Sequence, residues 1–150
     1  MLGSTGTALS RDHGCGSPTT HAAIDLCGFK APQSAARRVV RTALAGKADG
    51  EYLDDVVLVA DELVGNAVEH AGEALAMVID VYNWGVAVQV RDREAKTAEV
   101  PEKPLAAGED DEHGRGLLLV DALASAWGVQ RDSAGKRVTA IFMHRTGDAE

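Results

Sequence analysis

The sequence is poor in cysteine and has no long apolar run. Its two cysteines, Cys15 and Cys27, stand in a chain without an export signal, so we expect both thiols to be reduced and incidental. Together with His13 and His21 they match none of the compact zinc-binding spacings. No apolar run approaches the ~20 residues of a membrane-spanning helix. These absences predict a cytoplasmic protein that has no membrane partner.

Positive charge is also scarce. The chain has 15 Lys and Arg residues against 23 Asp and Glu residues, which gives a formal net charge of −8. Nucleic-acid binding needs a basic face, so we expect no direct nucleic-acid partner. An acidic protein that binds an anionic ligand has to gather positive potential locally, from backbone N–H groups, a few cations or a metal ion. A length of 150 residues with 45% hydrophobic content suits one globular domain with a core.

Regular apolar patterns fill most of the chain after a tail rich in Gly, Ser and Thr at residues 1–20. A long polar segment at 93–113 interrupts them. The patterns predict, in chain order, a strand at 22–29, helices at 31–45 and 51–71, a hairpin at 74–91, a helix at 117–127 that ends at Gly128, and a hairpin at 129–144. This order favours an α+β fold, a two-layer sandwich with helices on one face of a mixed or antiparallel sheet.

A polar stripe runs along the helix predicted at 51–71. Glu62, Asn66 and His70 recur every four residues and therefore lie on one side of that helix. The amide oxygen of Asn66 can bind a hard cation such as Mg²⁺. The carboxylate of Glu62, one turn earlier, can accept a proton from an attacking nucleophile. A solvated polar flank is the alternative explanation of the stripe.

Two further features are candidates for ligand binding. Asp92 follows directly on the second strand of the first hairpin, and Gly114-Arg115-Gly116 opens a helix. Glycines allow close approach of a ligand to the backbone, and a helix start offers unpaired N–H groups to an anion. Separately, Arg37, Arg38 and Arg41 form a basic cluster on the helix at 31–45. That cluster is either a solvated face or a surface for a partner.

These motifs together resemble a known superfamily. Residues 62–67 (ELVGNA) followed by 70–72 (HAG) resemble the N box of the GHKL ATPase and kinase superfamily, closest to the anti-sigma-factor serine kinases of actinobacterial type. The later motifs are similar to its G1 box, its G2 box with the following helix, and its final hairpin: residues 90–92 (VRD), 114–120 (GRGLLLV) with 126–128 (AWG), and 135–138 (GKRV).

The resemblance implies a Bergerat ATP-binding fold at residues 21–146, between the flexible tail 1–20 and a flexible C-terminus at 147–150. It also implies roles by position. Asn66 would coordinate Mg²⁺ on the ATP phosphates, Glu62 would be the general base, and Asp92 would accept from the adenine amino group. Gly114 and Gly116 would close over the phosphates, where Arg115 adds charge, and Lys136 would face the site. His70 is assigned to packing or capping instead.

The function implied by the resemblance is that of an ATP-binding anti-sigma factor. Its partners would be a sigma factor, an anti-anti-sigma protein with a STAS domain, or both, and relatives often form homodimers. Serine kinase activity towards the STAS partner is the leading hypothesis. The alternative is a non-catalytic regulator that holds its partner with the same fold, with ATP as a structural ligand or absent.

Overall fold

The computed structural model describes residues 17–93 and 112–144, with the side chains of the last helix described from Leu117 onward. Five strands form one sheet in the order β1-β2-β3-β5-β4, and each pair of neighbours is antiparallel. The elements follow one another as β1 (Thr20–Asp25), α2 (Pro32–Leu44), α3 (Gly50–Ala71), β2 (Ala74–Tyr82), β3 (Gly85–Asp92), α4 (Glu112–Leu123), β4 (Ala126–Asp132) and β5 (Gly135–Met143).

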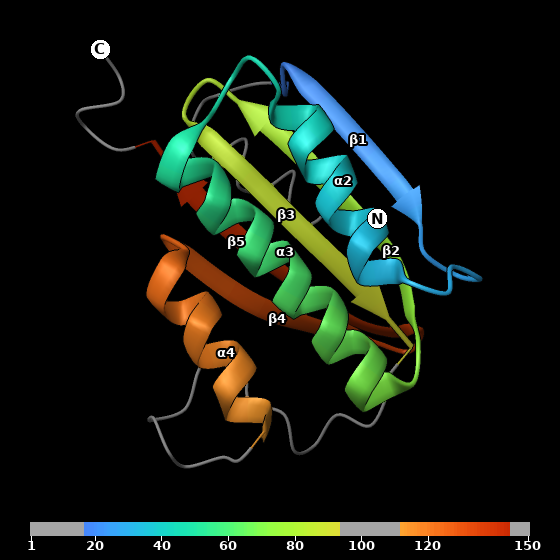
Figure 1. The fold of residues 1–150 in the computed structure, drawn as a ribbon. Coiled ribbons are helices and arrows are strands. Elements are labelled where there is room, and N and C mark those ends of the chain that lie inside the picture. Colours follow the sequence, from blue (N-terminus) through green and yellow to red (C-terminus); the bar gives the residue numbers. More distant parts are fainter. Residues whose placement is uncertain (1–16, 94–111, 145–150) are drawn as a thin grey trace.

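The helices of the described residues, α2, α3 and α4, lie on the same face of the sheet (Figure 1). Because side chains alternate across a strand, one face of each strand turns towards the helices. The buried residues of the central strands on that face are Met77, Ile79, Val81, Val86, Val88, Val90, Ala140 and Phe142. They form one core with the buried faces of α2 and α3. The predicted two-layer α+β sandwich is therefore confirmed, and its described sheet is antiparallel.

Helix α3 crosses the middle of the sheet and follows the predicted apolar period. Val56, Ala60, Leu63 and Ala67 recur at helical spacing and are all buried. The helix ends at Gly72, which adopts a φ of 84° and whose N–H donates to the carbonyl of Val68 at 2.9 Å. A glycine at this position tolerates the left-handed conformation that closes a helix. The C-terminal boundary of the helix was thus predictable.

Gly128 does not end a helix, so that prediction is wrong. Helix α4 stops at Leu123, and Gly128 lies within β4, where it pairs with Thr139 of β5. Ser125 marks the change, because its N–H donates to the carbonyl of Ile141 at 2.7 Å and its Oγ accepts from the N–H of Met143 at 2.8 Å. The apolar residues continue from helix into strand without a break, so the sequence period alone did not separate the two elements.

Several predictions fall wholly or partly on residues outside the described part. The tail at 1–20 is described only from Ser17, and residues 147–150, His13, Cys15 and residues 94–111 of the long polar segment lie outside it. Cys27 is an exposed free thiol. None of the helices in the described residues is long and apolar enough to cross a membrane.

Candidate functional site

A cavity opens between the helices α3 and α4 and the strands β3, β5 and β4. Three of the residues predicted for the site, Asn66, Asp92 and Lys136, line it together with His70. Its remaining walls are apolar and come from all five elements: Leu63, Ala67, Val90, Leu117, Val129 and Val138. Apolar walls with a few convergent polar groups are typical of sites for small organic ligands.

Asp92 and Lys136, which both line this cavity, form a buried ion pair. The two residues are directly opposite in the register of β3 and β5, and Nζ of Lys136 lies 3.5 Å from Oδ2 of Asp92. Their side chains are only 10% and 3% exposed, respectively. A buried carboxylate is tolerated when a cation and hydrogen bonds compensate for lost water. The side chain of Asp92, the last residue of β3, thus has a cationic partner beside the apolar walls.

Gly135 allows the two strands to come this close. It adopts a φ of 150°, and a Cβ placed on it would lie 2.0 Å from the backbone oxygen of Asp92. Such a distance is far below van der Waals contact, so a side chain at position 135 requires the backbone to move. The glycine before Lys136 is thus part of the geometry that sets Lys136 against Asp92.

Helix α3 contributes Asn66 and His70 to the cavity from successive turns. Sequence reasoning assigned His70 to packing or capping and did not place it at the cavity. The signal that could have found it was the four-residue spacing from Asn66, which puts both side chains on one side of the helix.

Glu62 lies one turn before Asn66 and is not among the described residues that line the cavity. It is partly buried. Burial, followed by the negative charges of Asp61 and Glu69, raises the pKa of Glu62 above its ordinary value. A carboxyl group with a raised pKa is a better proton acceptor when ionised, which suits a general base.

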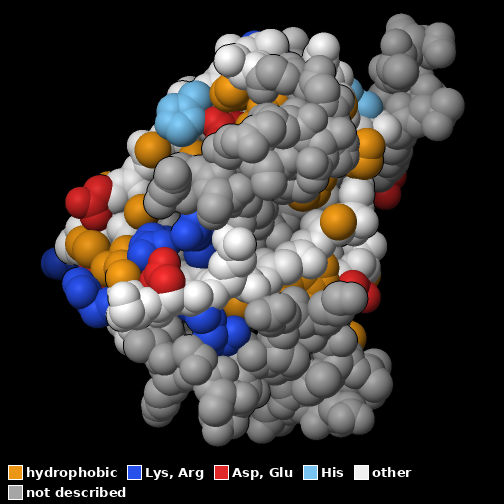
Figure 2. All heavy atoms as spheres, turned by 180° about the vertical axis from the view of Figure 1, so that it is seen from behind, with side chains coloured by type: hydrophobic (Ala, Val, Ile, Leu, Met, Phe, Trp, Pro, Cys, Tyr) orange, Lys and Arg blue, Asp and Glu red, His pale blue; other side chains and the backbone are white. Residues whose placement is uncertain are grey.

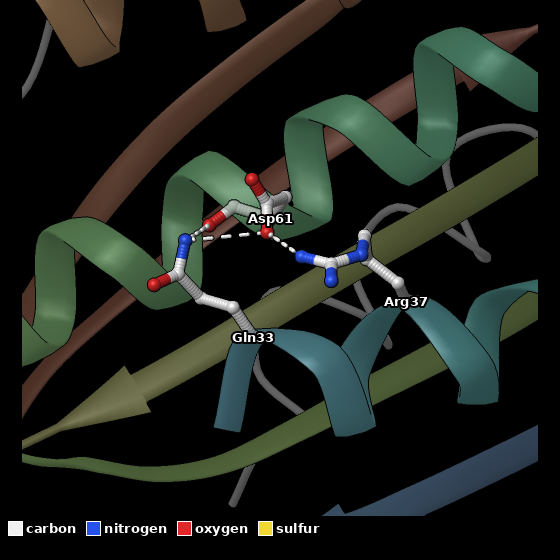
Figure 3. A network of polar contacts seen from close by, with 3 residues as sticks. All are labelled: Gln33, Arg37 and Asp61. Atoms are coloured by element: carbon white, nitrogen blue, oxygen red, sulfur yellow. Dashed lines mark hydrogen bonds and ion pairs between the residues drawn. The ribbon is translucent and has the colours of Figure 1, made fainter. Parts of the chain in front are cut away.

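Asp61, the neighbour of Glu62, ties α3 to α2. Its Oδ1 accepts from Nη1 of Arg37 at 2.6 Å and from Nε2 of Gln33 at 3.2 Å, and its backbone oxygen accepts from the same Gln33 nitrogen at 3.2 Å. Figure 3 shows both α2 side chains reaching towards Asp61. The contact fixes α3 against α2 beside Glu62. Arg37, a member of the basic cluster on α2, is therefore partly engaged within the fold.

A separate group of charges lies on the sheet face opposite the helices. Arg91 and Arg137 are opposite each other in register, and Oδ2 of Asp132 lies 3.5 Å from Nη2 of Arg91 and 3.9 Å from Nη2 of Arg137. Figure 2 shows this face, where Lys and Arg side chains gather near an acidic side chain. The N–H of Ala134, and then the charge of Arg91, hold the pKa of Asp132 below its usual value.

The glycine motif predicted to close over phosphates lies within the first turns of α4. The helix begins at Glu112, so Gly114, Arg115 and Gly116 are its third to fifth residues. The side chain of Arg115 lies outside the described part of the chain. Within that part the motif is a helix start on the α3 side of the sheet, in the layer that contains the cavity (Figure 1).

The donor set fits the base end of a nucleotide. A planar base suits the apolar walls, and its polar edge would meet Asp92 and Lys136. The cavity volume of about 40 Å³ is below the roughly 300–1,000 Å³ of pockets that bury whole ligands, so it must widen to admit a base.

In residues 17–93 and 112–144 no three His, Cys, Asp or Glu side chains gather to hold a metal ion. Mg²⁺ would depend on Asn66, phosphate oxygens and water.

Comparison with solved structures shows the same fold. A crystal structure of the RsbU and RsbW domains of Rv1364c from Mycobacterium tuberculosis superposes with a TM-score of 0.63 and 22% identity. It covers 84% of this chain, which spans only 33% of that longer chain. The SiaB-SiaC complex from Pseudomonas aeruginosa superposes with a TM-score of 0.62 and 15% identity, covering 92% of this chain and 97% of that one. No curated protein sequence matches this chain significantly.

The family model of the histidine kinase-like ATPase domain matches residues 31–142, from the start of α2 almost to the end of β5. The matched segment contains every residue that lines the cavity. A family described as an ATPase domain implies ATP binding. The resemblance of the sequence motifs to the GHKL superfamily is thereby confirmed: the chain belongs to the histidine kinase-like ATPase domain family.

Proposed function

We propose that the chain is an anti-sigma factor that binds Mg·ATP and phosphorylates a serine of an anti-anti-sigma partner of STAS type. The observation that carries the proposal is the cavity that brings Asn66, Asp92 and Lys136 together from α3, β3 and β5. The similarity in fold to a structure that contains an RsbW domain supports the choice of partner class.

Each residue has a separate role in this proposal, set by its position. Asp92 accepts a hydrogen bond from the base, and the apolar walls exclude water around it. Asn66 would hold Mg²⁺ through its amide oxygen, and the ion would neutralise charge on the phosphates. Glu62, one helical turn before Asn66, takes the proton of the attacking serine hydroxyl while the serine oxygen forms its bond to phosphorus. Bound ATP supplies the phosphoryl group and leaves as ADP. Phosphoryl transfer depends mainly on such positioning and charge neutralisation.

Thermal unfolding with Mg·ATP or Mg·GTP tests nucleotide binding. A ligand that binds only the folded state stabilises it by about 2.7 kcal/mol at a hundred times its Kd. We expect the melting temperature to rise with Mg·ATP and to stay unchanged with Mg·GTP. No rise with either nucleotide would contradict nucleotide binding altogether.

Incubation with labelled ATP and a cognate STAS protein tests transfer. Glu62→Ala should abolish serine phosphorylation while largely preserving ATP binding, and Asn66→Ala should weaken Mg·ATP binding itself. Asp54→Ala, at an exposed acidic position of the same helix, is the matched control and should change neither. Intact partner binding without phosphorylation in the wild type would contradict kinase activity.

A non-catalytic regulator is the second candidate. It is favoured by the small cavity and by the place of Glu62 outside the cavity lining. Partner binding would then not need Glu62. It would involve other surfaces, such as the hollow on α2 lined by Ser34, Arg37, Arg38, Arg41, Thr42 and Ala45. Under either candidate, reversing the charges of exposed Arg38 and Arg41 to Glu should slow association with an acidic partner, more strongly at low salt.

A further inference from the structure

We propose that Lys136 is a second reader of the nucleobase, which donates a hydrogen bond to ring nitrogen N1 of adenine while Asp92 accepts from the 6-amino group. This inference rests on the proposed nucleotide binding and assigns base specificity within the same site. It makes Lys136 a specificity-determining residue and not simply a nearby cation.

The arrangement of the two side chains carries the proposal. Cross-strand pairing of β3 with β5 places a donor and an acceptor side by side, with Nζ of Lys136 3.5 Å from Oδ2 of Asp92. Both side chains are nine-tenths or more buried, and both line the cavity. A lysine ammonium has three donors, so it can hold the carboxylate and still donate to a ligand. The wall therefore offers an acceptor and a donor together.

Adenine matches this pair at two neighbouring positions. Its 6-amino group is a donor and its N1 is an acceptor. In guanine bound in the same pose, the donor and the acceptor exchange places, because O6 is an acceptor and N1 carries a proton and is a donor. The carboxylate of Asp92 would then face an acceptor, and the ammonium of Lys136 would face a donor. A site whose buried polar groups are left unpaired by an analogue rejects that analogue strongly.

A simpler role for Lys136 makes a different prediction. If Lys136 only neutralises the buried Asp92, the affinity for a nucleotide will not depend on which atom occupies position 1 of its base. Removing the lysine would weaken every nucleotide by a similar factor. The two roles therefore separate on an analogue that lacks N1.

Isothermal titration calorimetry with Mg·ATP, Mg·GTP and the Mg complex of 1-deaza-ATP makes the test. In the wild type we expect 1-deaza-ATP, which has a C–H in place of N1, to bind about tenfold or more weaker than ATP. In Lys136→Met we expect ATP to weaken by a similar factor and the penalty for 1-deaza-ATP to disappear. The preference for ATP over GTP should fall in the same variant.

Arg131→Met is the matched control. Arg131 is the cross-strand neighbour of Lys136 on β4, and it is not among the described residues that line the cavity. Removing this cation should lower the affinity for all three nucleotides by one common factor and keep the 1-deaza-ATP penalty.

The outcomes separate this assignment from the proposed function. Wild type that binds ATP and 1-deaza-ATP equally overturns the role of Lys136 and leaves nucleotide binding standing. The same conclusion follows if Lys136→Met still binds 1-deaza-ATP as much more weakly than ATP as the wild type does. Wild type that binds no nucleotide overturns the proposed function, and the assignment with it. The comparison of analogues needs only the wild type, so it decides even if Lys136→Met does not fold.

Discussion

The guanidinium of Arg37 on α2 lies 2.6 Å from the carboxylate of Asp61 on α3, one residue before Glu62. The negative charge of Asp61 is among the causes that raise the pKa of Glu62, after burial. A cation on a different helix thus lies against one of the charges that set the protonation of the proposed base.

Replacing Arg37 by Met should raise the pKa of Glu62 further, because the charge of Asp61 would no longer be opposed. Titration of the Glu62 carboxyl carbon by NMR measures this directly. The ion pair is partly exposed, so the free energy of unfolding should fall by only about 0–1 kcal/mol. Arg41→Met removes an exposed arginine from the same helix and serves as the control. An unchanged Glu62 titration in Arg37→Met would show that Arg37 has no influence on the base.

Replacing Glu62 by Gln should stabilise the protein at neutral pH. The pKa of Glu62 is higher in the folded chain than in the unfolded chain, so its contribution to stability is fully present below the unfolded pKa of about 4.3 and is lost as the pH rises through the folded pKa. Gln carries no charge and avoids that loss. Urea unfolding from pH 4 to pH 8 should show that the free energy of unfolding of the variant increases relative to that of the wild type as the pH rises. A constant difference across this range would contradict the expectation.

Replacing Gly135 by Ala should lower the free energy of unfolding by about 1–3 kcal/mol, as expected for a strained backbone and an overpacked contact. The cause is the clash with the backbone oxygen of Asp92. Chemical denaturation measures the loss. Gly128→Ala is the control in the neighbouring strand, because its Cβ would meet nothing within 4 Å. Equal effects at the two positions would rule out the close contact as the reason.

Replacing Asp132 by Asn should remove part of the acid sensitivity of the fold. The pKa of Asp132 is lowered, so its stabilising contribution is present above the ordinary value of about 3.9 and is lost as the pH falls through the folded pKa. The variant should be less stable than the wild type at pH 6, since Arg91 and Arg137 would stand opposite each other without their shared counter-ion. The difference should shrink towards pH 2 in urea titrations. Asp54→Asn, at an exposed position, should keep the wild-type acid response.

The fold was predictable where one local period decided it. Helix α3 and the β2–β3 hairpin follow their sequence patterns closely, and Asp92 stands at the strand end where it was expected. Gly128 was misassigned because an apolar run has no period that separates the end of a helix from the start of a buried strand.

The candidate site was only partly predictable. Asn66 and Asp92 carry motif signals, whereas the contact of Lys136 with Asp92 depends on a strand register set by pairing between distant segments. The pairing of Arg37 with Asp61 likewise depends on how two helices pack, and a sequence pattern on one helix does not contain that information.

The contact between Gln33 and Gly65 has a consequence for how this chain can change. A Cβ at position 65 would lie 2.9 Å from Nε2 of Gln33, in the middle of the motif that resembles the N box. A side chain at position 65 therefore requires the end of the Gln33 side chain on the neighbouring helix to move. A larger residue there should be accepted together with a shorter one at position 33, so the two positions are expected to vary as a pair among related chains while Asn66, the next residue, varies independently of position 33.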